Sequence, residues 1–441
     1  MNKNVKIVKN KVTSFKNIKS EPKEKKTNAN FGVIENPKTI PATDKKYIIN
    51  YLTQTDAYKF SMGQLYFHKR PNEYAKWEFK LRTKDVHLGY MYDDVVREVK
   101  HLCTLRFQNW ELEGIHNKMP WLHNDYIEHL EDVQLKEKYI SITKNGKDLE
   151  IVAYGPQQQV FWFEIYILQI VQHLWFKDEK IDWNVAKSNL ANVVKKWNDL
   201  LRSGVKFTVS DFGIRRSIDD EWNEYMVSYL RDFCPAFVGT SNVYLAIKCD
   251  VKPIGTFAHE LYAIYQGLKD IPVALAQVQV LEDWTKEYRG DLGIALSDNF
   301  GFNAFLRDFD KYYAKLFDGC RHDSGDPIKW GEMLINHYTK IGIDSRTKTA
   351  CWSDSLDADR ACEIAKHFNG RINIAFGIGT FLSATICGTK KKPLSMVMKV
   401  VEVNGKPVVK LSDSIGKTMC HDQKYIDYIK EVYQYKSIDE E

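Results

Sequence analysis

The chain has 441 residues, of which 44% are hydrophobic and 13% aromatic. That composition provides apolar material for two globular domains and excludes a chain that is disordered throughout. The formal net charge of +5 is uneven: residues 1–46 hold 12 Lys and four Asp or Glu, a net of +8, so the remainder carries −3. The eight Cys form no Cys-x-x-Cys pair, and no stretch has the ~20 uninterrupted apolar residues of a membrane span. We therefore predict a cytoplasmic protein with reduced thiols and no membrane partner.

Residues 1–46 are rich in Lys, Asn and Ser and lack a sustained apolar period. We expect a disordered or loosely attached tail. A contact with nucleic acid or a membrane is the alternative, but Lys without interleaved aromatic residues supports it weakly, and no nucleic-acid partner is expected. The N-terminus also lacks the apolar segment of a signal peptide.

The next part of the chain, up to residue 204, mixes helical and strand periodicities. In chain order these predict a helix over 56–67, a strand over 73–82, helices with breaks over 93–140, a strand over 149–154 that ends in a turn at Gly155-Pro156, a buried helix over 161–175 and an amphipathic helix over 182–202.

From residue 205 onward, seven short apolar segments each run into a polar loop. They cover residues 206–210, 236–238, 251–254, 293–296, 316–320, 349–352 and 371–376. Helical patterns lie between most of them, including an apolar period over 302–317 and a helix from Asp326-Pro327 to about Gly342. Repeated strand–loop–helix units predict a parallel sheet, and seven of them indicate an α/β barrel whose chemistry lies at the strand carboxyl ends. A doubly wound open sheet is the alternative.

After residue 386 the pattern alternates again, and residues 394–403, Asn404-Gly405 and residues 407–411 predict a hairpin. We expect the hairpin to join the strands near residues 73–154. The predicted fold class is thus α/β, with these domains: an irregular seven-stranded α/β barrel over residues 205–385, and a mixed α+β domain from both chain ends, residues 47–204 with 386–441.

The best candidate nucleophile is His259, in the run Gly255-Thr256-Phe257-Ala258-His259-Glu260. The run places the ring in the first turn of a helix, where N–H groups disfavour the imidazolium and leave a neutral, nucleophilic imidazole. Asp298, at the next strand end, is placed to orient the ring and stabilise a charged product. A capping or core histidine is the alternative.

Polar loops after the last three apolar segments have the small residues and carboxylates of phosphate-binding sites. In the first loop, Asp323 and Asp326 are candidates for binding Mg²⁺ or ribose, with a helix-capping role as the alternative for Asp326. Ser353-Asp354-Ser355 and Gly377-Ile378-Gly379-Thr380 together are similar to the phosphate grip of a barrel's last strands.

Arg215 and Arg216 follow Phe212-Gly213. An aromatic ring beside a guanidinium suits a planar anionic ligand, which stacks on the ring and pairs with the cation. Surface ion pairs with Asp219 or Asp220 are the alternative. Tyr58 and Lys59 have no specific meaning by themselves beyond the start of an amphipathic helix.

Taken together, these loops resemble bacterial nicotinate phosphoribosyltransferases from about residue 47 to about 425. The matching segments are Thr55–Lys59, Glu78–Arg82, Phe212–Arg216, Phe237–Asn242, Gly255–Glu260, Ala304–Phe309, Arg321–Pro327, Phe376–Thr380 and Lys410–Asp413. Residues 1–46 fall outside the resemblance.

The resemblance implies a type II phosphoribosyltransferase-like fold and the first step of NAD salvage. Nicotinate attacks C1 of phosphoribosyl pyrophosphate, giving nicotinate mononucleotide and pyrophosphate, with Mg²⁺ as cofactor. ATP is a co-substrate, hydrolysed through a phosphohistidine. Members are commonly homodimers with shared active sites.

Residue by residue, the resemblance implies roles for matching positions. His259 matches the phosphorylated histidine, Asp298 its supporting carboxylate and Asp323 the ribose or metal carboxylate. Among the substrate-binding positions, Phe212 and, from the other subunit, Tyr58 match rings that stack on the pyridine. Arg215 and Arg321 match basic residues at the nicotinate and ribosyl-pyrophosphate site. The positions that match the 5′-phosphate loops are Ser353, Gly377, Gly379 and Thr380, and Lys410 is a weaker match.

Three alternatives remain open. Nicotinamide is the nearest rival substrate, but amide-selecting relatives place a carboxylate where this chain has Ser241 and Asn242, neutral donors that suit a carboxylate. A decarboxylating quinolinate enzyme would require a more basic pocket. A non-catalytic binding role for the Lys-rich tail is the third.

Overall fold

The computed structural model describes residues 40–440 except 42, 45, 415–417 and 419. The predicted tail, residues 1–46, therefore lies almost entirely outside the described residues. All described residues belong to one compact unit, Pro37–Glu441, in which the two predicted domains pack together.

A five-stranded antiparallel sheet is built from both chain ends, as predicted. Its order is β13-β12-β1-β3-β2, and its strands are β1 (Tyr74–Leu81), β2 (Ile140–Asn145), β3 (Asp148–Pro156), β12 (Met396–Val403) and β13 (Lys406–Pro407). The predicted turn at Gly155-Pro156 is wrong, because both residues continue β3 and pair with β1. Gly155 instead makes room for a neighbour: a Cβ there would lie 2.5 Å from the Tyr139 ring.

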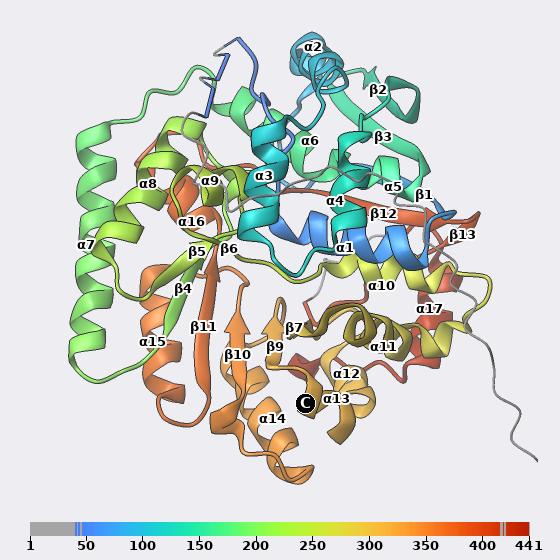
Figure 1. Ribbon diagram of the computed structural model, residues 1–441, viewed down its shortest axis with the longest axis vertical. Coiled ribbons are helices and arrows are strands. Elements are labelled where there is room, and N and C mark those ends of the chain that lie inside the picture. The colour runs from blue at the N-terminus through green and yellow to red at the C-terminus, as the bar shows by residue number, and fades with distance from the viewer. Residues whose placement is uncertain (1–39, 42, 45, 415–417, 419, 441) are drawn as a thin grey trace, which may run out of the picture. The chain divides into compact units, whose positions relative to one another are not determined.

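A second, seven-stranded parallel sheet has the order β6-β5-β4-β11-β10-β9-β8. Its strands fall at the seven predicted segments: β4 (Thr208–Asp211), β5 (Phe237–Thr240), β6 (Lys252–Pro253), β8 (Ile294–Leu296), β9 (Gly319–His322), β10 (Thr349–Trp352) and β11 (Asn373–Ile378). A further strand, β7 (Arg289–Leu292), lies outside this sheet. In Figure 1, β4, β11, β10 and β9 lie in this order below β12.

This strand order is that of a barrel opened at one seam. The first strand, β4, pairs with the last, β11, and every other pair is sequential, which supports the predicted barrel over the alternative of a doubly wound sheet. The seam lies between β6 and β8, the two ends of the order. Thr256 Oγ1 spans it by donating to Ile294 O at 2.8 Å.

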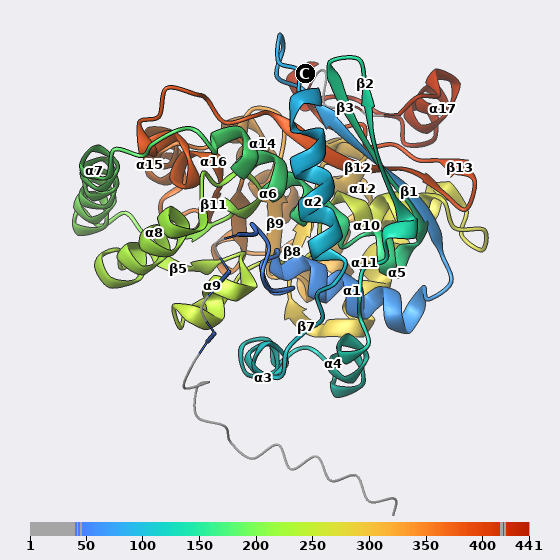
Figure 2. The ribbon, with the colours of Figure 1, turned by 90° about the horizontal axis from the view of Figure 1, so that it is seen from above.

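The helices follow the predicted periods closely. Before the barrel they are α1 (Ala57–Lys69), α2 (Tyr92–Leu102), α3 (Asn109–Lys118), α4 (Asn124–Glu131), α5 (Gln157–Val160), α6 (Phe163–Phe176) and α7 (Trp183–Arg202). From the barrel onward they are α8 (Asp220–Phe233), α9 (Val243–Lys248), α10 (His259–Gln266), α11 (Ala276–Tyr288), α12 (Phe302–Asp308), α13 (Lys311–Leu316), α14 (Pro327–Lys340), α15 (Ala358–Phe368), α16 (Thr380–Ser383) and α17 (Gln423–Val432). Helix α7 packs against α8 and α15, away from α17 and β13 (Figure 2).

Capping residues explain several helix limits. Asp326 accepts a hydrogen bond from Lys329 N at 2.7 Å ahead of Pro327, which confirms the predicted cap. The apolar period over 302–317 is not one helix, because Asp310 starts a second helix by accepting from the amides of Tyr312 and Tyr313. A local cap therefore interrupts a continuous apolar face.

The cysteines and the hydropathy of the helices can also be compared with the sequence-based expectations. All eight Cys are free thiols, and seven of them are buried. In the described part of the chain, no helix combines the length and hydropathy needed to cross a bilayer.

We predict that Thr256→Val weakens the open seam. The substitution keeps the shape of the side chain but removes the hydrogen bond to Ile294 O, a loss of about 1 kcal/mol, measured as a lower urea midpoint. Thr285→Val is the matched control, because Thr285 Oγ1 donates at 2.8 Å to Leu281 O within its own helix. Equal destabilisation by both substitutions would contradict a special role for the seam.

Candidate active site

A cavity of about 380 Å³ lies at the carboxyl ends of the parallel strands and is covered by β1 and β12 of the antiparallel sheet. Most predicted site residues line it. They are Tyr58, Phe212, Arg215, Ser241, His259, Arg321, Asp323, Ser353, Gly379, Thr380 and Lys410. The structure thus gathers loops that are up to 350 residues apart in the chain around one space.

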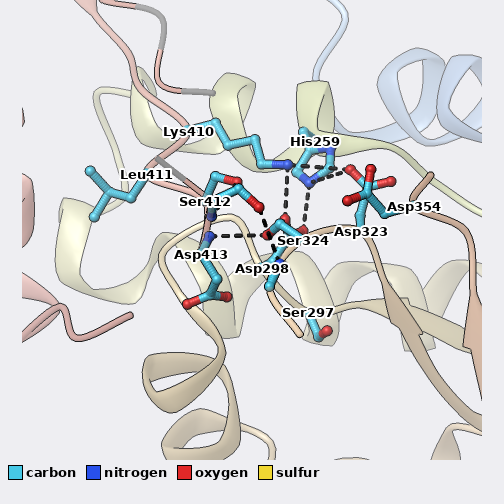
Figure 3. A network of polar contacts seen from close by, with 12 residues as sticks. His259, Ser297, Asp298, Asp323, Ser324, Asp354, Lys410, Leu411, Ser412 and Asp413 are labelled. Carbon is cyan, nitrogen blue, oxygen red and sulfur yellow. Dashed lines mark hydrogen bonds and ion pairs between the residues drawn. The ribbon is translucent and has the colours of Figure 1, made fainter. Parts of the chain in front are cut away.

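His259 is the first residue of α10, as predicted, and its ring is held by Asp298 (Figure 3). The distance from Nε2 to Asp298 Oδ1 is 2.7 Å, and that to Asp323 Oδ2 is 3.7 Å. Because Nε2 donates to the Asp298 carboxylate, Nδ1 keeps the lone pair that a nucleophile requires. Asp298 itself is buried behind the ring and does not line the cavity.

The neutral state of His259 has a different cause from the predicted one. Burial is the largest influence and the Lys410 ammonium adds to it, so together they lower the pKa of His259 to about 4 against the attraction of Asp298. The imidazole is therefore neutral at pH 7, as predicted. Its low pKa depends on burial and on Lys410, which outweigh Asp298.

Lys410 is central, although sequence reasoning treated it as a weak match. Its Nζ lies 2.9 Å from Asp298 Oδ2 and 3.3 Å from Asp323 Oδ2. Burial opposes ionisation of both carboxyl groups, but Lys410 and His259 outweigh it: the pKa of Asp298 falls well below its ordinary value and that of Asp323 to about 2. Both aspartates are ionised at neutral pH.

At the opposite end of the cavity, Phe212 and Gly377 form a tightly packed pair. A Cβ on Gly377 would lie 2.2 Å from the Phe212 ring, so the glycine gives that ring its place. Gly377 belongs to β11 and is not a cavity-lining residue, whereas Gly379 and Thr380 are. The predicted phosphate contact of Gly377 remains a prediction.

Tyr58 lines the cavity of its own chain. It is the second residue of α1. The resemblance implied that this ring stacks on the pyridine from the other subunit, and that role remains a prediction.

A buried charge network that sequence reasoning missed surrounds Lys59. Its ammonium, fully buried, pairs with Glu164 at 2.7 Å and with Glu260. Burial and the nearby Glu164 raise the pKa of Glu260 to about 8 despite Lys59. Glu164 Oε1 also lies 3.8 Å from Arg215 Nη1, so the network connects the Phe212 end of the cavity to the helix of His259. A single carboxylate in the apolar run 161–175 was the available signal.

Three further cations, Arg82, Arg216 and Lys399, line the cavity and were not predicted as site residues. Burial, Lys410 and Arg82 lower the pKa of Lys399 to about 7, and burial with Arg215 and Arg82 lowers that of Arg216 to about 10. The cations thus repel one another, which a polyanionic ligand would relieve. Lys399 belongs to β12 and Arg82 directly follows β1, and the alternation of these segments predicts a sheet but not a ligand.

Arg321, in β9, and Ser353, directly after β10, differ in their hydrogen bonding. Arg321 Nε is buried without a hydrogen-bond partner among the described residues, as expected for a donor that awaits an anion. Ser353 Oγ already donates to His322 O at 3.0 Å. Asp326 is not a cavity-lining residue and acts as a helix cap, and its predicted metal or ribose contact remains a prediction.

The fold and site define a class: an α/β-barrel enzyme whose cation-lined cavity contains a neutral histidine and an aromatic ring. The family models agree. Residues 53–172 match the N-terminal domain of nicotinate phosphoribosyltransferases, and residues 207–437 match the nicotinate phosphoribosyltransferase family. The chain belongs to the nicotinate phosphoribosyltransferase family.

Individual relatives support the same assignment. The chain is 42% identical to the nicotinate phosphoribosyltransferase of Burkholderia mallei over 395 residues, 88% of this chain and 97% of that one. It is 40% identical to that of Acinetobacter baumannii over 405 residues, covering 89% and 99%. The crystal structure of the Vibrio cholerae nicotinate phosphoribosyltransferase superposes with a TM-score of 0.84 at 31% identity, over 89% of this chain and 95% of that chain.

We predict that Gly377→Ala displaces the Phe212 ring and raises KM for the pyridine substrate about fivefold, the value of one lost aromatic contact of ~1 kcal/mol. Steady-state kinetics with each substrate varied should show a smaller effect on the other substrate. Phe212→Ala and the double variant form the control cycle. Adding Gly377→Ala to Phe212→Ala should cost nothing further, and additive effects would contradict the packing explanation.

Proposed function

We propose that this protein transfers the phosphoribosyl group of phosphoribosyl pyrophosphate to nicotinate, in the first step of NAD salvage from nicotinate. ATP hydrolysis is coupled through a phosphohistidine at His259. The observation that carries the proposal is the shared cavity. One space of about 380 Å³ contains a stacking ring and guanidinium at Phe212 and Arg215, a cation cluster, and a neutral histidine held by a carboxylate.

The pyridine ring stacks on Phe212, with Tyr58 in reach from the same chain, and its carboxylate pairs with Arg215. A bidentate guanidinium–carboxylate pair in a partly buried pocket is strong and directional. This pair holds the ring nitrogen in line with C1 of the ribose, which lowers the entropy cost of the reaction.

Nicotinamide is the second candidate substrate, and one observation favours it. The buried Asp56 carboxylate also lines the cavity, and an acceptor is what an amide N–H₂ needs. Moreover, Asn242 does not line the cavity, and its Oδ1 caps α9 by accepting from Leu245 N. Arg215 favours nicotinate, since a neutral amide gives this guanidinium no carboxylate to pair with beyond Glu164, whose Oε1 lies 3.8 Å away.

Phosphoribosyl pyrophosphate fits the cation-lined part of the cavity. Arg321, with its unpartnered Nε, and the facing Lys399 and Lys410 neutralise charge that grows on the leaving pyrophosphate. Backbone N–H groups near Gly379 and Thr380 serve the 5′-phosphate. C1–O cleavage leaves an oxocarbenium-like centre, the pyridine nitrogen forms the new bond to C1, and pyrophosphate departs.

The donor set fits Mg²⁺ in one respect: the Asp323 carboxylate is ionised and lines the cavity. Mg²⁺ binds in proteins through one or two carboxylates together with substrate phosphate oxygens. Asp323 would hold the ion, which supplies charge neutralisation at the pyrophosphate.

His259 carries the ATP step. Nδ1 attacks the γ-phosphorus, the bond from this phosphorus to the β,γ-bridging oxygen breaks, and ADP leaves. The proton stays on Nε2, which keeps donating its hydrogen bond to Asp298. The phosphate on His259 lies beside Lys410 and Asp323, where it alters the binding of pyrophosphate. The homodimer implied by the resemblance is a further part of the proposal, which the native mass of the protein tests.

A product assay tests the function directly. With phosphoribosyl pyrophosphate and Mg²⁺, we expect nicotinate to give its mononucleotide at least about 10²-fold more efficiently than nicotinamide, with no product from quinolinate. ATP should raise the yield of nicotinate mononucleotide. Arg215→Lys should lose most of the preference, because an ammonium does not form the bidentate pair. Preferred turnover of nicotinamide would sink the proposed substrate.

Labelling with γ-³²P-ATP tests the phosphohistidine. We expect an acid-labile, alkali-stable label that is absent in His259→Ala and reduced in Asp298→Asn. Because the pKa of His259 is lowered to about 4, its ring stays neutral as pH falls through 6.5 and protonates only near 4. NMR titration of ¹³C-labelled histidine, assigned with His259→Ala, measures this. A midpoint near 6.5, or label that survives in His259→Ala, would defeat the assignment.

A further inference from the structure

Outside the cavity, two histidines and a glutamate from three helices converge. They are His68 in the last turn of α1, His123 directly before α4, and Glu287 near the end of α11. One donor atom from each lies within 4.8 Å of the other two. Helix α1 packs against α11, so the cluster sits where the N-terminal helices meet the barrel.

The donors suit a transition metal. Two imidazoles and one carboxylate match the ligands that Zn²⁺ takes at about 2.0–2.2 Å, whereas Mg²⁺ and Ca²⁺ prefer oxygen. Tetrahedral ligands at those distances lie roughly 3.4 Å apart. The present spacing therefore requires only small side-chain rotations to close around an ion.

The environment of His68 favours the same interpretation. One ring nitrogen, Nδ1, lies 2.5 Å from Glu287 Oε1, and the other, Nε2, lies 3.2 Å from Asp125 Oδ2. Whichever nitrogen binds an ion, the other keeps a carboxylate partner. A carboxylate on the second ring nitrogen is the usual means by which proteins orient a metal-binding histidine.

His123 and Glu287 contribute independent signs. Among the described residues, no hydrogen bond engages the His123 ring, whose backbone N–H instead binds Gln64 Oε1 at 2.6 Å. The Glu287 carboxylate is buried, with 4% of its side chain exposed, and its ionic contact is His68. A bound cation would neutralise the buried negative charge of such a carboxylate, and the imidazole beside it has a ring nitrogen that can bind the cation.

We propose that His68, His123 and Glu287 bind one divalent transition-metal ion of the Zn²⁺ type, with Asp125 orienting His68. The ion links α1, α4 and α11. Because α1 also carries Tyr58 and Lys59 into the cavity, the ion holds a wall of the site against the barrel. Its role is structural, and it takes no part in phosphoribosyl transfer.

The test uses full-length, tag-free protein stripped of metal, in a His259→Ala background that removes the competing cluster of His259, Asp298 and Asp323. Titration with ZnCl₂ by calorimetry should show one equivalent bound, and saturation should raise Tm by about 3 °C or more. Adding His123→Ala or His68→Ala should remove that equivalent and the Tm rise. Asp125→Asn should weaken binding about tenfold.

His87→Ala is the matched control, since His87 is exposed and pairs with one carboxylate, Asp148 at 2.7 Å. It should bind Zn²⁺ like its parent. The exposed His123 side chain makes His123→Ala a mild change to the metal-free protein, whose Tm stays at the parent value. Zn²⁺ binding that is absent in the parent, or unchanged in both His68→Ala and His123→Ala, overturns the proposal.

Discussion

The buried charge cluster around Lys410 is the constraint on which the site depends. Two carboxylates, Asp298 and Asp323, lie close to one imidazole and one ammonium. Buried charges of this kind are tolerated only when each is paired and hydrogen-bonded. Without Lys410 the two aspartates would repel each other, and the pKa of His259 would rise. The His259 ring is neutral because it is buried and because a cation from another part of the chain lies beside it.

The same cluster ties the C-terminal segment to the barrel (Figure 3). Ser324 Oγ donates to Asp298 Oδ2 at 2.5 Å and accepts from Asp413 N at 3.0 Å. The Asp413 carboxylate in turn accepts from the amides of Phe302 and Ile438. The segment that delivers Lys410 is therefore hydrogen-bonded to the barrel through Ser324 and Phe302. This segment runs from the antiparallel sheet to the carboxyl ends of the parallel strands. Its hydrogen bonds explain why the two predicted domains belong to one compact unit.

Much of this architecture was readable in local patterns. Seven apolar segments predicted seven strands, and the limits of each predicted strand lie within three residues of the observed ones. This agreement is possible because strand and helix periods depend on residues that are near one another in the chain. The errors are local too. Gly155 was taken for a turn residue, but it yields space to Tyr139, and Asp310 breaks an apolar period that has no other interruption. Both depend on a single contact that periodicity does not record.

The amino-acid sequence by itself determined the element order, the polar loops at the strand ends and the position of His259 at the start of a helix. Tertiary structure alone decided which charges meet. Lys59 pairs with Glu164 and with Glu260, 201 residues away, and Arg82 and Lys399 enter the cavity from the antiparallel sheet. It also decided that Tyr58 lines the cavity of its own chain. The physical reason is that hydrophobic periodicity is a property of neighbours in the chain, whereas a pKa or an ion pair depends on distances that exist only after folding.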